Sequence, residues 1–273
     1  MNRRLVAAAS SALLMAGATL SLSPAGTVSA SMAITHAPRI ALTPPKTQPG
    51  HGGGGGGGGG SSSGFGWASS NWSGYAVTGG PYTAVTGQWV VPAVASSSKP
   101  TYSSSWVGID GFNNSDLIQT GTEQDFYSGQ PHYSAWWEIL PAAETVIPDP
   151  VSPGDVMQAS IAKQPSGLWL ITLTDTTKGW TAQETESYSG PGTSAEWIQE
   201  APTVGGRVAT LADYGTTTFD PGTANGANPG LVAADGGVMI QKRAQVSTPS
   251  LPDSDSDGFN ISYGSSSPSA PAS

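Results

Sequence analysis

The stretch SWVGIDGFNNSDLIQTGT, residues 105–122, decides the fold class of this chain. It holds two short runs of apolar and β-branched residues, and a segment of Gly, Asn, Ser and Asp separates them. Runs of this length and composition, with turn-forming residues between them, are typical of β-strands. We therefore predict strands over 102–108 and 117–120. The second of these carries Gln119 among apolar neighbours.

The same pattern continues through the body of the chain, where Gly and Pro interrupt runs rich in Trp, Tyr, Val and Thr. Further strands are predicted over 82–91, 133–140, 156–161, 168–175, 181–187, 194–199, 211–219, 238–241 and 259–263. We find no amphipathic helix and no internal repeat. Many strands without helices predict an all-β fold, either a sandwich of two antiparallel sheets or a barrel.

Alternation along three of these strands places polar side chains beside apolar ones. Gln119 shares a face of its strand with Leu117, and Glu196 shares a face with Ile198. Glu138 follows two tryptophans in the third strand. A buried polar group left unpaired costs about 1–3 kcal/mol. We therefore expect these three side chains to meet partners in a groove.

The amino-terminal residues have the features of an export signal. Arg3 and Arg4 precede an apolar run over 5–22, and small residues at 28–30 suit a signal peptidase. The run is too short and too rich in small residues for a membrane span. We predict a signal peptide over 1–30 and a secreted, extracellular protein without a membrane partner.

Residues 31–64 have a composition that cannot form a core alone, because they contain four prolines and nine consecutive glycines at 52–60. We interpret this part as a linker or a pro-segment. Residues 65–264 are predicted to form one domain with a substantial core. The Ser- and Pro-rich tail at 265–273 is expected to be disordered.

Composition excludes several classes of function. The chain has no cysteine, which excludes disulfides, cysteine nucleophiles and cysteine-based zinc sites. Only ten residues are Lys or Arg, so a basic nucleic-acid-binding patch is not expected. The scarcity of cations suggests tolerance of acid, although lightly charged secreted β-proteins share it. Nothing in the sequence demands an oligomer, so we expect a monomer.

Several familiar motifs do not carry chemistry here. The pattern Gly-x-Ser-x-Gly at 60–64 falls in the glycine-rich linker, not at a strand-to-helix turn. His132 is the only histidine in the predicted domain and is interpreted as a turn residue, which argues against a Ser-His-Asp triad. The sequence DSDSDG at 253–258 resembles the start of a calcium loop but lacks its closing glutamate, so a polar turn is predicted.

Five segments together resemble the glutamic peptidase family, the eqolisins. They are SNWSGY at 70–75, WVGIDG with LIQTG at 106–121, YSAWWEILP at 133–141, SAEWI at 194–198 and LADYGTTTF at 211–219. The segments occur in the family's order and span most of the predicted domain.

The resemblance implies a β-sandwich of two seven-stranded antiparallel sheets, a concanavalin-like jelly roll, in a secreted acid endopeptidase acting on polypeptides. Gln119 and Glu196 match the family's catalytic pair. Glu196 would take a proton from the attacking water, and Gln119 would position that water and donate to the oxyanion. The residues implied to bind substrate or to support the site are Trp72, Trp106, Asp110, Trp136 and Glu138. No metal or cofactor is implied.

Three questions stay open in the sequence. Leu140 replaces an aromatic residue of the family pattern, which leaves subsite preference unassigned. The segment 31–64 carries basic residues and no acidic ones, so it fits either an inhibitory pro-segment or a passive tether. Two other functions also fit a sandwich: a glycoside hydrolase using Glu138 and Glu196, or a binding module without chemistry.

Overall fold

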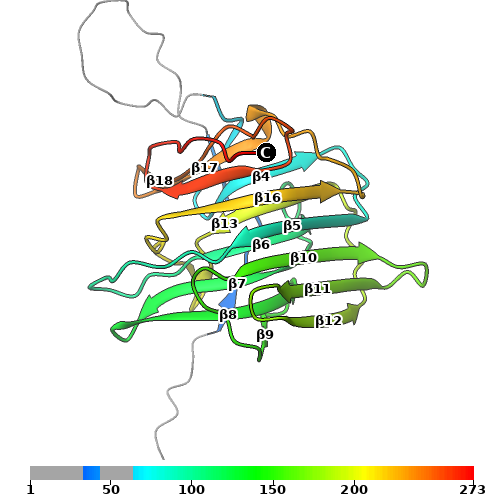
Figure 1. Cartoon of the computed structure of the whole chain (residues 1–273), viewed down its shortest axis with the longest axis horizontal. Coiled ribbons are helices and arrows are strands. Elements are labelled where there is room, and N and C mark those ends of the chain that lie inside the picture. The colour runs from blue at the N-terminus through cyan, green and yellow to red at the C-terminus, as the bar shows by residue number, and fades with distance from the viewer. Residues whose placement is uncertain (1–32, 44–63) are drawn as a thin grey trace, which may run out of the picture. The chain divides into compact units, whose positions relative to one another are not determined.

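The computed structural model describes residues 33–43 and 64–273. The predicted signal peptide and the glycine run therefore lie outside the described residues. The described part is nearly all β, with one 3-10 turn, η1, at Ala233–Asp235 (Figure 1). No helix in these two ranges is long and apolar enough to cross a membrane.

The strands of the first half are β1 Ile34–Thr35, β2 Ala41–Leu42, β3 Trp67–Ser69, β4 Trp72–Thr78, β5 Ala84–Val90, β6 Ser104–Asp110, β7 Leu117–Tyr127, β8 Gln130–Ile139 and β9 Thr145–Ile147. Those of the second half are β10 Val156–Lys163, β11 Trp169–Asp175, β12 Trp180–Glu186, β13 Ser194–Glu200, β14 Thr203–Val204, β15 Arg207–Val208, β16 Thr216–Ala224, β17 Gly236–Gln241, β18 Ala244–Pro249 and β19 Phe259–Tyr263.

The main strands form two packed layers (Figure 1). One layer has the order β12-β11-β10-β5-β16-β19-β18, and the other has the order β17-β4-β13-β6-β7-β8-β9. The antiparallel sandwich expected from the sequence is confirmed. The sheet count differs, because pairing of β17 with β18 joins the layers into one 16-stranded network, and β1, β14 and β15 form a separate three-stranded sheet.

Large aromatic side chains fill the space between the layers. Trp89 of β5, Phe219 of β16 and Trp197 of β13 are almost fully buried there. Each indole also crosses to the opposite layer, since Trp197 Nε1 donates to Thr86 O at 2.8 Å and Trp89 Nε1 donates to Thr122 Oγ1 at 3.0 Å. These bonds satisfy the polar end of each indole inside the core and fix how the layers meet.

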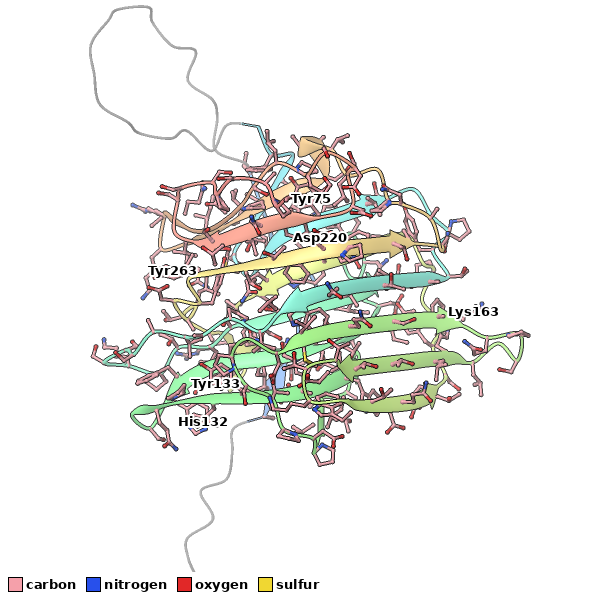
Figure 2. The ribbon with its side chains drawn as sticks, in the orientation of Figure 1. Tyr75, His132, Tyr133, Lys163, Asp220 and Tyr263 are labelled. Atoms are coloured by element: carbon pink, nitrogen blue, oxygen red, sulfur yellow. The ribbon has the colours of Figure 1, made fainter. Side chains whose placement is uncertain are left out.

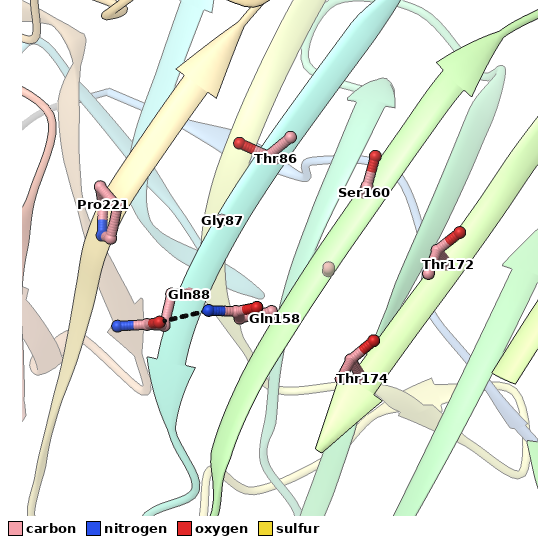
Figure 3. Close-up of a pocket in the computed structure, with 9 residues that line it drawn as sticks. Thr86, Gly87, Gln88, Gln158, Ser160, Thr172, Thr174 and Pro221 are labelled. Atoms are coloured by element: carbon pink, nitrogen blue, oxygen red, sulfur yellow. Dashed lines mark hydrogen bonds between the residues drawn. The ribbon is translucent and has the colours of Figure 1, made fainter. Parts of the chain in front are cut away.

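One pocket lies on the outward face of the layer that contains β5, β10, β11 and β16 (Figure 3). It is lined by Thr86, Gly87, Gln88, Gln158, Ala159, Ser160, Thr172, Thr174 and Pro221. None of these side chains titrates in the ordinary pH range. The candidate chemistry therefore lies on the other layer.

Among the longer strands the sequence missed β4 and β18 and misplaced the starts of β8 and β16; it also missed the short strands β1, β2, β3, β9, β14 and β15. β4 was not predicted, because Gly74 and small polar residues hide its alternation. Gly74 has a φ of 130°. A Cβ there would lie 2.2 Å from Trp197 O, so the position requires glycine. The unpredicted β18 reads AQVSTP, in which a single Val is the only strong strand-forming apolar residue. The strand predicted over 211–219 instead begins at Thr216 and continues to Ala224.

His132 lies within β8, next to Tyr133, and not in a turn before it (Figure 2). Its ring stacks on Tyr127 with a centroid distance of 3.7 Å, and its Nε2 lies 3.2 Å from Tyr127 O. The strand begins earlier than predicted because the β7–β8 hairpin pairs through Gln130. These contacts give His132 a structural role.

Candidate active site

Four residues stand in one row across neighbouring strands. Glu196 of β13 pairs with Gly108 of β6, Gly108 pairs with Gln119 of β7, and Gln119 pairs with Glu138 of β8. Directly paired residues point to the same face of a sheet. Two strand spacings, about 10 Å, separate the backbones of Glu196 and Gln119. Gly108 has no side chain, and a Cβ there would lie 2.9 Å from Trp106 Cζ3 and 3.2 Å from Leu117 Cδ1, so these apolar side chains pack over the position between them.

Tryptophans surround this row on the same face. Trp72, Trp106 and Trp136 are fully buried and form a second apolar cluster with Leu117 and Ile198, separate from the core between the layers. Trp72 and Trp106 meet edge to face with ring centroids 4.8 Å apart. Charges inside such an apolar enclosure interact more strongly than in water.

The segment 33–43 runs across this face and is held at both ends (blue in Figure 1). β1 pairs with β14, and β2 pairs with β3. Between them, Trp72 Nε1 donates to Ala37 O at 3.0 Å, and Asn71 Nδ2 donates to the same oxygen at 3.3 Å. The guanidinium of Arg39 lies 3.9 Å from the ring centroid of Phe112. The segment is therefore bound in an extended form along the groove.

Gln119 contacts the main chain of this segment. Its Nε2 donates to His36 O at 3.2 Å and to Glu138 Oε2 at 2.7 Å. His36 N in turn donates to Glu138 Oε2 at 3.1 Å. Gln119 Oε1 and both carboxyl oxygens of Glu196 are buried without a hydrogen-bond partner among the described residues. The row therefore offers one donor, Gln119 Nε2, to a backbone carbonyl. Beside it lie three unpaired acceptors, Gln119 Oε1 and the two carboxyl oxygens of Glu196.

Both glutamates of the row favour their neutral form. Burial raises the pKa of Glu196 well above its usual range. Burial also raises the pKa of Glu138 to about 8, although the charge of His36 and hydrogen bonds from His36 N and Gln119 oppose the shift. Glu138 is therefore neutral throughout mild acid.

The imidazole of His36 fills a cage of carboxyl groups. It stacks on Trp136 with a centroid distance of 3.7 Å and an interplanar angle of 7°. Its Nδ1 lies 3.1 Å from Glu200 Oε2, and its Nε2 lies 3.1 Å from Glu123 Oε1 and 3.2 Å from Glu144 Oε2. Burial alone would lower the pKa of His36, but these carboxylates overcome that effect and raise it well above its usual value.

Sequence reasoning missed this cage, although part of it was accessible. Glu200 follows Glu196 by four residues on one strand, and Glu123 follows Gln119 by four on another. Alternation therefore places both on the groove face. Glu144 lies in a connection, and His36 lies in the segment interpreted as linker, so no periodic signal marked either residue.

Asp110 lies at the end of β6 and organises the neighbouring loops. Its carboxylate accepts hydrogen bonds from Tyr188 Oη at 2.7 Å, Gly192 N at 2.8 Å, Thr193 N at 2.8 Å and Asn114 Nδ2 at 2.8 Å. Both carboxylate oxygens of Asp110 already accept hydrogen bonds from the protein itself and not from a substrate. The contacts indicate a supporting role.

The change Asp110→Asn should destabilise the fold by about 1–3 kcal/mol, because an amide cannot accept from this whole set of donors. Both KM and kcat should change little at a temperature where the variant is folded. Urea unfolding monitored by tryptophan fluorescence measures the effect. Asp116→Asn is the matched control, since Asp116 is exposed. A large rise in KM without loss of stability would instead assign substrate contact to Asp110.

Two groups of side chains within the described ranges have ligand atoms within 4.8 Å of one another, as a metal would require. One is His36, Glu123 and Glu144, and the other is Asp220, Asp253 and Asp257. The second group takes Asp253 and Asp257 from the DSDSDG stretch, where a polar turn was predicted and the chain bends over 254–257. Asp253 Oδ1 accepts there from the main-chain N of Asp257 at 3.1 Å. Neither group includes Gln119 or Glu196.

Comparisons with known proteins identify the family of the chain. The model of the Peptidase A4 family matches residues 70–263. Aspergillopepsin-2 of Aspergillus niger is 30% identical over 196 residues, which cover 63% of this chain and 70% of that protein. Two solved structures share the fold. Scytalido-glutamic peptidase with a transition state analog inhibitor has a TM-score of 0.61 at 23% identity and covers 71% of this chain and 98% of its own.

The second structure is SCP-B, described as a member of the eqolisin family in complex with the tripeptide Ala-Ile-His. It has a TM-score of 0.56 at 24% identity and covers 71% of this chain and 98% of its own. The family match spans both strands that carry Gln119 and Glu196. The chain therefore belongs to the peptidase A4 family, the eqolisins, and is a glutamic-type endopeptidase.

Proposed function

We propose that this chain is a secreted, acid-active endopeptidase that hydrolyses peptide bonds with Gln119 and Glu196. One observation carries the proposal: the side-chain amide of Gln119 donates to a backbone carbonyl oxygen, His36 O, inside the groove. An oxyanion donor makes this contact with the carbonyl of the bond to be cleaved. The two unpaired oxygens of Glu196 on the same face supply the base.

The reaction follows from these two side chains. Ionised Glu196 takes a proton from a water, whose oxygen attacks the carbonyl carbon. Gln119 Oε1 accepts the second hydrogen of that water, and Gln119 Nε2 donates to the oxygen that gains negative charge. Glu196 then gives its proton to the departing nitrogen as the carbon–nitrogen bond breaks. A raised pKa makes ionised Glu196 a stronger base, while it reduces the ionised fraction in acid.

Glu138 is assigned a positioning role. Its carboxyl group accepts from Gln119 Nε2 and from the main-chain N of the bound residue, His36. It therefore orients the amide donor and the backbone of the substrate at once. With a pKa of about 8 it adds no negative charge near the oxyanion in acid.

We assign the segment 33–43 an inhibitory role, in preference to a passive tether, because it fills the groove in this chain. The carboxyl groups of the cage raise the pKa of His36. Binding of the segment 33–43 in the groove therefore weakens as pH rises through that raised pKa. Burial raises the pKa of Glu123 to about 6, although the charge of His36 opposes the shift. Binding of the segment therefore also weakens as pH falls through that value. The segment should therefore bind most tightly near neutral pH and loosen in acid.

The two alternative functions have less support. Gly108 and Gln119 stand between Glu196 and Glu138 in the row, so the two glutamates are not direct neighbours across the sheet. Glu138 is also engaged by Gln119. A binding module without chemistry would have no reason to keep the Glu196 carboxyl buried and unpaired.

The nature of the occupant supports a polypeptide substrate. The chain's own residues Ala33, Ile34, Thr35 and His36 lead to the carbonyl held by Gln119. SCP-B, which shares this fold, is described in complex with the tripeptide Ala-Ile-His. We propose that the protein acts as a monomer on polypeptides outside the cell, without a nucleic-acid or membrane partner.

The experiment uses the full-length protein, preincubated at each pH between 2 and 7 and then mixed with a denatured protein or a panel of polysaccharides. We expect release of peptides after a lag in acid and slow or no release near neutral pH. Activity on polysaccharide alone would replace the peptidase assignment with the glycosidase. Binding of peptide without cleavage at any pH would favour the binding module.

A further inference from the structure

We propose that Glu123, Glu144 and Glu200, with Trp136 as their floor, form a substrate pocket for a cationic side chain on the amino side of the cleaved bond. The preferred residue would be histidine in its protonated form. The inference rests on the proposed function, because Gln119 defines which carbonyl is cleaved.

The position of the pocket follows from the main chain of the bound segment. Gln119 holds the carbonyl of His36 and Glu138 holds its amide N–H, so His36 is the residue immediately before the bond presented to the dyad. Its side chain is fully buried, and the cage encloses it. The pocket is therefore the one that receives the residue on the amino side of the cleaved bond.

Some carboxyl oxygens in the walls of the pocket receive no hydrogen bond from the described residues. Glu123 Oε2 and Glu200 Oε1 lack hydrogen-bond partners within the described ranges, and Glu123 Oε1 lies 3.1 Å from His36 Nε2, the side chain that fills the pocket. The side chains of Glu123 and Glu200 are 2% and 0% exposed. Buried carboxyl groups without partners are costly when ionised. A cation in the pocket supplies charge and donors to them, whereas an apolar side chain supplies neither.

The floor of the pocket does not distinguish charged from neutral rings. The face of Trp136 stacks on the imidazole of His36 at 7°, and a phenyl ring can stack in the same way. The imidazole adds two N–H groups, which lie 3.1–3.2 Å from carboxyl oxygens on three sides. Histidine and phenylalanine therefore form a matched pair of probes for charge.

Among residues 33–43 and 64–273, the titratable groups that face the bound imidazole are acidic. Glu123 projects from β7, Glu138 from β8 and Glu200 from β13, while Glu144 comes from the β8–β9 connection. Asp125 follows Glu123 by two residues on the same face of β7, and burial followed by the charge of Glu123 raises the pKa of Asp125. Selectivity for a cation should therefore fall when acid neutralises these carboxylates.

The experiment uses the full-length protein with His36→Ala, so that the pocket is not filled by the chain's own side chain. Two peptides are compared: residues 33–40, Ala-Ile-Thr-His-Ala-Pro-Arg-Ile, and the same peptide with phenylalanine in place of histidine. We expect kcat/KM to favour the histidine peptide by about tenfold at pH 6, with a smaller ratio at pH 4. Residual competition by the segment affects both peptides equally and leaves the ratio unchanged.

Glu144→Gln, added to the same protein, should lower the rate for the histidine peptide more than the rate for the phenylalanine peptide, so that the ratio of the two rates falls. Glu184→Gln on β12 is the control, because Glu184 is exposed on the other layer and should change neither rate. Equal or faster cleavage of the phenylalanine peptide at pH 6 would overturn the pocket while leaving the peptidase intact.

A binding measurement separates the pocket from the chemistry. Calorimetry with both peptides on the protein carrying His36→Ala and Glu196→Gln needs no turnover. Tighter binding of the histidine peptide would support the pocket even if neither peptide were cleaved by the active form, a result that would count against the proposed function alone. Equal affinities at pH 6, or no binding of either peptide, would refute the pocket.

Discussion

Replacement of Gln119 by alanine should lower kcat by about 100- to 1000-fold, the usual effect of removing one oxyanion donor. The reason is geometric, since Gln119 Nε2 already lies 3.2 Å from a backbone carbonyl oxygen in the groove. The ground-state carbonyl keeps its other contacts, so KM should change much less than kcat. Initial rates on a single peptide in acid measure both constants.

Two controls accompany Gln119→Ala. Gln183→Ala changes the same residue type at an exposed position on β12 and should leave kcat unchanged. Gln119→Met keeps about the length of the side chain but has no hydrogen-bond donor, and it should lose as much kcat as Gln119→Ala. Wild-type kcat in either Gln119 variant would remove Gln119 from the oxyanion site.

Thermal stability should rise as the pH falls from 8 to about 4.5. Burial raises the pKa of Glu138 from 4.5 to about 8 and raises the pKa of Glu196 and Asp125 in the same direction. The folded state therefore binds more protons than the unfolded state across this interval. Stability is fully present below the unfolded pKa and is lost as pH rises through the folded pKa.

Each unit of pKa difference corresponds to about 1.4 kcal/mol, so these carboxyl groups together predict a change of several kcal/mol. Composition alone suggested only that acid would do little harm, and the buried carboxyl groups change that expectation to a gain. Calorimetry between pH 4.5 and pH 8 measures it. Glu138→Gln carries a permanently neutral side chain and should flatten the dependence. A melting temperature that is flat or rises with pH in the wild type would contradict the account.

Local pattern predicted much of the fold because alternation is a local property. Runs around Gln119, Glu138 and Glu196 were strand-like, and their alternation placed each side chain on one face. The register that aligns Glu196, Gly108 and Gln119 joins strands about 80 residues apart in sequence, and no local pattern determines it. The resemblance to the eqolisins implied that Gln119 and Glu196 act together. The strand register in the structure shows how they align across the sheet.

The segment in the groove was beyond local prediction for a different reason. Residues 33–43 bury little apolar surface of their own, so composition indicated a linker. Their order comes from contacts with distant residues, such as Asn71 and Trp72 at the start of β4 and Glu200 on β13. Glu138 was correctly singled out from its strand, but its bonds to Gln119 and to His36 N required coordinates.

The most direct test of the account is the rate at which the full-length protein carrying Glu196→Gln cleaves one defined peptide in acid, relative to the wild type. Glutamine keeps the size of the side chain and removes the base, so we predict a loss of about 10²–10⁴-fold in kcat with peptide binding retained. Cleavage by Glu196→Gln at a rate close to that of the wild type would contradict the central claim that Glu196 activates the attacking water.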